Sequence, residues 1–158
     1  MNTDVCKLAE NIADSDVKNN FLNFIGFCES LRLRPRLYAS EKMNIKFRGK
    51  RILRFDPSVL NGNLYLFFTV SYSSELQDLL SKLPDDMQSA FLENVDRRCK
   101  HEECIACKPN PKRKYRILGS VHELCSNEMR FVNPTKEQFE YLKKWVVVRK
   151  EFISATAK

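Results

Sequence analysis

The chain has 158 residues, of which 43% are hydrophobic and 30% are charged. This composition excludes an intrinsically disordered chain, and no apolar run approaches the roughly 20 residues that a membrane-spanning helix needs. The N-terminus lacks a basic start followed by an apolar core, so we expect no secretion signal, no membrane attachment and a cytoplasmic location.

The net charge of +7 is concentrated in two stretches of the chain. Residues 32–54 carry nine Lys or Arg against one acid, and residues 97–116 carry eight against two. The remaining excess of acids lies in residues 1–31 and 55–96. Such local basicity indicates an anionic partner, either nucleic acid or an acidic protein surface, or compensation for negative charge nearby.

The first part of the chain predicts helix followed by strands. Residues 1–16 predict a loose N-terminal helix, and apolar residues recur at helical spacing over 17–31. Apolar and polar residues alternate over 43–47, which predicts a half-buried strand. Gly49 suits a tight turn into a second strand over 52–55.

The middle of the chain predicts an interior strand and two helices. Residues 64–72 are apolar on both faces, as expected of a strand covered on both sides. Ser74 and Gln77 have the spacing of a capping box at the start of a short helix. A second helix is expected over 85–98, with Asp85 as its N-cap.

The last part of the chain predicts one strand and one long helix. Residues 115–118 predict a fourth strand, with an extension to Val121 left open. Thr135 and Gln138 form a second capping box, at the start of a C-terminal helix. That helix carries two apolar stripes, so it needs burial on two sides or against a partner.

Together these elements predict an α+β protein. Helices pack on a mostly antiparallel sheet of about four strands, and a zinc-knuckle-like cysteine loop projects from it. We expect a single domain over residues 1–158, with 1–16 as an extension and 99–125 holding the cysteine cluster and its basic loop.

The cysteine cluster follows the spacing C-x4-C-x2-C-x17-C and consists of Cys99, Cys104, Cys107 and Cys125. Thiols stay reduced in the cytoplasm, so disulfides are not expected. A C-x2-C knuckle with two further thiolates gives the tetrahedral set typical of structural zinc. A [2Fe–2S] cluster, a redox dithiol and metal-free thiols remain open, as does replacement of one cysteine by His101 or His122.

A second candidate site is an anion-binding surface built from the basic stretches. Aromatic residues lie among the charges, namely Tyr38, Phe47 and Tyr115, and these could stack on bases. The more ordinary interpretation is a solvated sheet face and turn. The residues that would contact phosphates are Arg48, Lys50, Arg51, Arg54, Lys112, Arg113 and Lys114.

Three features together resemble a family of small bacterial proteins with no established activity. They are an xYKGKR-type hairpin, a short cysteine cluster and an F-x-N-P…KK…RK tail. In this chain they correspond to Ile45–Arg51, to Cys99, Cys104 and Cys107, and to Phe131–Pro134 followed by Lys143-Lys144 and Arg149-Lys150. The resemblance covers roughly residues 19–152. It implies a shared fold and supplies no catalytic residues.

The sequence therefore favours a non-enzymatic, zinc-stabilised domain that binds a partner. A nucleic-acid-binding module that uses residues 32–54 and 97–116 is the second hypothesis. A small-molecule-sensing or enzymatic domain with a pocket between sheet and helices is the third. We identify no catalytic residues, since the chain has neither a Gly-rich phosphate loop nor a GxSxG motif.

Overall fold

The computed structural model describes residues 3–39, 42–58, 60–71, 75–96 and 113–156. Their contacts divide the chain into two compact units. We call residues 1–68 with 131–158 the sheet unit, and residues 69–130 the hairpin unit. No helix in these ranges is long and apolar enough to cross a membrane.

The described residues confirm an α+β fold with a mostly antiparallel sheet. The main sheet has five strands in the order β1-β2-β3-β4-β7, and β5 and β6 form a separate pair. Two of the five, β1 and β7, were not predicted. The strands are β1 (Pro35–Ala39), β2 (Lys42–Phe47), β3 (Lys50–Pro57), β4 (Leu64–Thr69) and β7 (Glu128–Val132).

The predicted turn between β2 and β3 is confirmed. Arg48 and Gly49 have φ angles of 48° and 78°, the pattern of a type I′ turn, which matches the twist of the strands it joins. A β-bulge then follows, because Ile45 pairs with Leu53 but Lys46 pairs with Arg51. The bulge shifts the pairing register of β3 by one residue.

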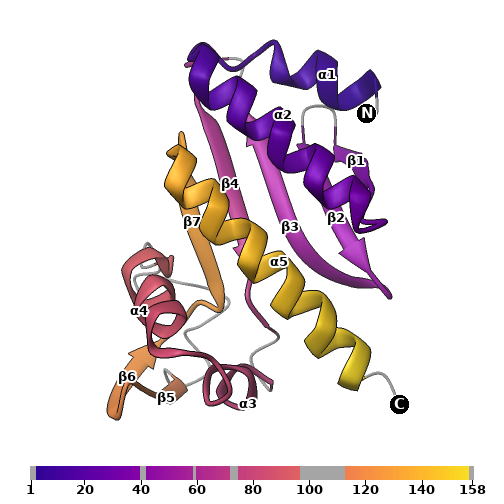
Figure 1. Cartoon of the computed structure of the whole chain (residues 1–158). Coiled ribbons are helices and arrows are strands. Elements are labelled where there is room, and N and C mark those ends of the chain that lie inside the picture. The colour runs from indigo at the N-terminus through magenta and orange to yellow at the C-terminus, as the bar shows by residue number, and fades with distance from the viewer. Residues whose placement is uncertain (1–2, 40–41, 59, 72–74, 97–112, 157–158) are drawn as a thin grey trace. The chain divides into compact units, whose positions relative to one another are not determined.

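Aromatic contacts place the helices of the sheet unit on one face of its strands. Phe21 packs edge-on against Phe55 of β3 with the ring centroids 5.0 Å apart, and Phe68 of β4 lies 6.2 Å from Trp145. Figure 1 shows α2 and α5 running across the same face of the strands. The helices of this unit are α1 (Thr3–Ala9), α2 (Ser15–Ser30) and α5 (Lys136–Thr156).

The N-terminal cap of α5 was predicted from the sequence, and the cap of α2 was not. At α5, the Thr135 amide donates to the Gln138 side chain and the Gln138 amide donates to the Thr135 hydroxyl, which confirms that capping box. At α2, the Asp14 carboxylate accepts from the amides of Asp16 and Val17. That cap was not predicted, although Asp in this position is common.

The hairpin unit contains two helices and the β5–β6 pair. They are α3 (Leu76–Leu80), α4 (Asp85–Asn94), β5 (Arg113–Ile117) and β6 (Ser120–Leu124). The predicted N-cap at Asp85 was wrong, since Pro84 holds that position and no side chain caps the helix. The helix predicted over 85–98 ends at Asn94, because Val95 turns to an extended conformation and bridges to Met129.

Two further expectations for this unit need correction. Gln77 does not act in the predicted capping box, because its side-chain amide forms hydrogen bonds with the backbone of Arg116. Ser74, the other predicted member of that box, lies outside the described residues. The strand over 115–118 ends at Ile117, because Leu118 and Gly119 take positive φ angles of 50° and 77° and form a turn. Val121 belongs to the returning strand.

Asn133 connects the start of α5 to the beginning of β4 through its side chain, and this connection can be tested by mutation. Its φ angle is 47°, its side-chain oxygen accepts from the Leu64 amide at 2.8 Å, and its side-chain amide donates to Asn63. We predict that Asn133→Ala lowers the free energy of unfolding by about 2 kcal/mol, roughly half from each lost hydrogen bond, plus the strain of a positive φ.

The matched variant Asn133→Gly loses the same hydrogen bonds but accepts the positive φ. It should therefore retain about 1 kcal/mol more stability than the alanine variant in urea denaturation. Equal losses in the two variants would contradict the role of the backbone angle.

Candidate nucleic-acid interface

The strand register divides the side chains of the sheet unit between two faces. Paired residues of an antiparallel sheet share a face, and successive residues alternate. Phe55 and Phe68 contact the helices, so their partners Met43, Leu66 and Leu53 face the helices as well. The residues between them point to the opposite face, which we call the cationic face.

One row of side chains crosses the cationic face over four strands. Arg36 pairs with Asn44, Asn44 pairs with Arg54, and Arg54 pairs with Phe67. At its centre, the guanidinium carbon of Arg54 lies 3.9 Å from the centroid of the Phe67 ring. This is a close cation–π contact, and it leaves Phe67 only 5% exposed.

Two neighbouring rows add charge to this face. On one side Lys42, Asp56 and Tyr65 lie beside one another, since Met43 pairs with Phe55 and Asp56 pairs with Tyr65. On the other side Lys46 pairs with Arg51 beyond the bulge. Over β1, β2 and β3 the cationic face therefore carries Arg36, Lys42, Lys46, Arg51 and Arg54, and Asp56 is the one acid described on that part of the face.

Asp56 lies between two of these cations without forming a tight ion pair. Its carboxylate is 3.7 Å from the Arg54 Nε and 3.8 Å from the Lys42 Nζ, distances too long for hydrogen bonds. Burial raises the pKa of the Asp56 carboxyl above its usual value of 3.8, and the charges of Arg54 and Lys42 oppose this shift. Asp56 therefore does not lock the Arg54 guanidinium into a bidentate pair.

Two of the predicted phosphate contacts do not belong to the cationic face. Arg48 lies in the turn and donates to the backbone of Ser154 in α5 at 3.4 Å. Lys50 pairs with Phe47, whose ring lies 5.7 Å from the Nζ of Lys150, so this pair faces the helices. Of the four residues predicted on this hairpin, the register leaves Arg51 and Arg54 on the cationic face.

The remaining basic candidates belong to the hairpin unit. Arg113 and Lys114 are exposed in β5, where Lys114 lies 3.6 Å from Glu123, and Lys112 lies outside the described residues. Tyr115 is buried and so is not available for stacking on a base. The expected convergence of the two basic stretches stays a prediction.

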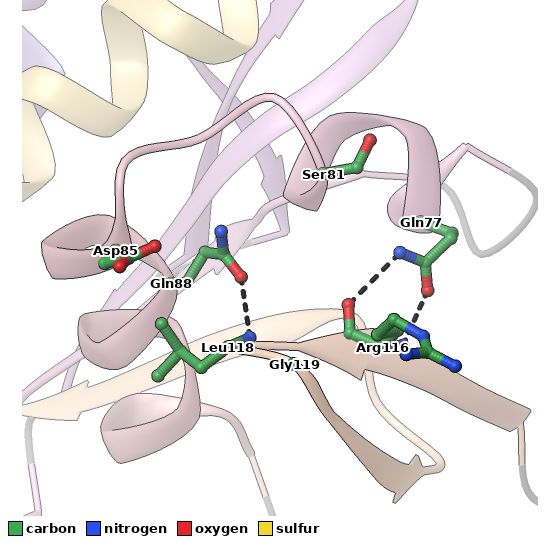
Figure 2. Close-up of a pocket in the computed structure, with 7 residues that line it drawn as sticks. All are labelled: Gln77, Ser81, Asp85, Gln88, Arg116, Leu118 and Gly119. Atoms are coloured by element: carbon green, nitrogen blue, oxygen red, sulfur yellow. Dashed lines mark hydrogen bonds between the residues drawn. The ribbon is translucent and has the colours of Figure 1, made fainter.

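A polar hollow of about 400 Å³ in the hairpin unit is already bridged by hydrogen bonds (Figure 2). The Gln77 side chain both donates to and accepts from the Arg116 backbone, as a neighbouring strand would. The Gln88 oxygen accepts from the Leu118 amide, and its nitrogen donates to Leu83. These two glutamines hold β5 against α3 and α4. The polar groups of the hollow therefore serve the packing of these elements rather than a ligand.

Three of the four candidate zinc ligands, Cys99, Cys104 and Cys107, lie outside the described residues, as does His101. Cys125 is half-buried directly after β6, and no set of three potential metal ligands is grouped within the described ranges. Cys28 is fully buried in α2, and this burial raises its thiol pKa to about 12, which makes it unreactive at neutral pH.

Sequence reasoning missed Lys42, Asn44 and Phe67 as members of one surface. Asn44 and Lys46 were recognised as the polar side of a strand, so the alternation was visible. Phe67 was assigned to an apolar interior strand, and its pairing with Arg54 depends on the register across the hairpin.

No family model matches the chain, and neither a curated protein nor a solved structure is detectably similar to it.

The raised pKa of Asp56 predicts a specific pH dependence of stability. An acid that holds its proton more tightly in the native state loses native stability as the pH rises from its unfolded pKa through its native pKa. Asp56→Asn removes this loss, so the variant should be more stable than the parent at pH 7 and equal to it below pH 3.8. Chemical denaturation at several pH values measures this. A variant less stable than the parent at pH 7 would contradict it.

Proposed function

We propose that the protein binds nucleic acid through the cationic face of the sheet unit. The observation that supports this most is the register, which gathers five cations against one acid among the described residues of β1, β2 and β3 on one sheet face. Three of the cations, Arg36, Lys42 and Lys46, are exposed. A surface of this kind attracts a phosphate backbone, and each contact releases counterions.

An acidic protein surface is the main rival as a partner, and two features favour nucleic acid. The charges lie in three adjacent rows that cross neighbouring strands. Because neighbouring strands are about 4.8 Å apart, the charges are spread over an extended surface rather than gathered at one position. Aromatic side chains lie among them, with Tyr65 half-buried beside Asp56 and Phe67 against Arg54. Cations interleaved with aromatic rings are typical of nucleic-acid-binding surfaces.

A charge reversal on each side of the sheet unit tests this proposal. We predict that Lys46→Glu weakens binding of a fluorescent oligonucleotide. The plot of log K against log salt should become less steep, its negative slope decreasing in magnitude by about 1. Lys144→Glu, on the exposed side of α5, changes the net charge equally and should leave both quantities almost unchanged. Equal effects of the two variants, or no binding at low salt, would contradict binding on this face.

We further propose that one structural zinc ion is bound by Cys99, Cys104, Cys107 and Cys125. The donor set fits, since four thiolates satisfy a closed tetrahedral site without a histidine. The described flanks of the cluster also support it. The Asp96 amide donates to the Glu128 carbonyl at 2.8 Å, which holds residues 96 and 128 side by side. Cys99 and Cys125 are each three residues from that contact.

The β5–β6 hairpin supports the same proposal from the other side. Arg113 pairs with Leu124, so the chain that arrives from Cys107 enters the hairpin next to Cys125. The x17 spacing is therefore mostly taken up by paired strands, and residues 108–112 are the remaining connection. Zinc binding energy would then add to the stability of the hairpin unit.

We predict about one zinc per chain in protein purified without added metal, measured by elemental analysis. Cys104→Ser should lose the metal and lower the melting temperature, because ligand binding energy counts as folding energy. The exposed Cys6 provides the control, since Cys6→Ser should keep both the metal and the melting temperature. Full zinc content in the Cys104 variant, or an unchanged melting temperature after verified metal loss, would contradict a structural zinc site.

A further inference from the structure

The Arg54–Phe67 contact gives the cationic face a planar group at its centre. The guanidinium lies 3.9 Å from the ring centroid, and Phe67 itself is 5% exposed. The Arg54 side chain keeps 25% of its surface exposed. The Phe67 ring is therefore covered, and a ligand on this row would meet the Arg54 side chain rather than the phenyl ring. Guanidinium planes, like aromatic rings, accept a stacked base.

The neighbours of Arg54 permit this orientation. Its Nε is buried and forms no hydrogen bond with the residues described, and its ion pair with Asp56 is long. A carboxylate that took the guanidinium edge-on in a bidentate pair would turn it away from the ring. Asp56 does not do so, and the stacked orientation is therefore compatible with both neighbours.

The residues on either side of Arg54 suit the other parts of a nucleotide. Asn44 pairs with Arg54 across the strands but is only 9% exposed, so the exposed cations around it are the groups that a nucleotide would meet. Arg36 ends the same row, and Lys42 and Lys46 lie in the adjacent rows, where phosphates would flank a base at the centre. A base-stacking plane is thus surrounded by phosphate-binding cations.

We infer that the cationic face takes single-stranded nucleic acid and that Arg54, held on Phe67, is the platform on which one base stacks. This inference rests on the function proposed above and makes it more specific. In a duplex the faces of the bases are already stacked on one another, so a duplex could use only the phosphate contacts of this face. A flat sheet face also presents no element of the kind that enters the major groove.

Two oligonucleotides of equal length separate base stacking from charge. One is oligothymidylate of twelve nucleotides, and the other is an abasic strand with the same phosphates but no bases. At one low salt concentration the wild-type protein should bind the thymidylate strand on the order of tenfold more tightly, as expected for one stacked base. A mixed-sequence duplex should bind at the level that its charge alone supports. This comparison requires no variant.

Arg54→Lys keeps the charge and removes the plane, so it assigns the effect to this residue. Its affinity for the thymidylate strand should fall to that of the abasic strand, and its affinity for the abasic strand should not change. Arg48→Lys makes the same substitution in the turn, away from the cationic face, and should retain the preference for bases. Thermal melting verifies that both variants are folded.

The possible failures are distinguishable. If neither strand binds at low salt, nucleic-acid binding itself is wrong, and this inference falls with it. If both strands bind equally, or if Arg54→Lys retains the preference, nucleic-acid binding stands and base stacking on Arg54 is wrong.

Discussion

The apolar layer between the sheet and its two covering helices is the constraint on which the rest of the sheet unit depends. Phe21, Phe24, Phe55, Phe68 and Trp145 are all at most 1% exposed in this layer. Burying one such side chain contributes on the order of 1.5–3 kcal/mol, so a one-residue slip of any strand would expose several of them at once. The register is therefore fixed by the face that packs on the helices. The cationic face is its consequence.

Concentrating charge on one face has a cost that the structure keeps small. Two unit charges 10 Å apart repel by about 0.4 kcal/mol at the dielectric constant of water, and salt reduces this further. The Phe67 ring provides Arg54 with a favourable contact. The repulsion that remains is the part that a polyanion would relieve on binding. Stability and binding are thus linked through the same side chains.

Local features of the fold were predictable from the sequence, and pairing was not. The helix over 17–31, the turn at Gly49 and the capping box of Thr135 and Gln138 depend on residues close together in the chain, and the structure confirms each of them. β7 was missed because its five residues, Glu128–Val132, alternate too briefly to stand out. The Asp85 cap was misplaced by one residue, since Pro84 also suits a helix start.

The candidate site shows the same limit. A count of charges found the basic stretch 32–54 but grouped Arg48 and Lys50 with Arg51 and Arg54. Alternation along β3 separates Lys50 from Arg51, Arg48 lies in the turn, and the bulge at Ile52 returns Arg51 and Arg54 to the same face. Phe67 joined the site only through its pairing with Arg54, a contact between strands that depends on register. The proposed zinc ligands are the opposite case, because their spacing is informative without any structure.

The bulge has a consequence for how this chain can change over evolutionary time. Ile52 and Leu53 are both fully buried, so the extra residue lets two consecutive apolar side chains be buried while Arg51 and Arg54 stay on the other face. A single-residue deletion between Lys46 and Leu53 would remove this offset and turn part of the hairpin over. Substitutions that keep the chain length would not. The β2–β3 hairpin should thus tolerate exchange of residues far better than insertions or deletions.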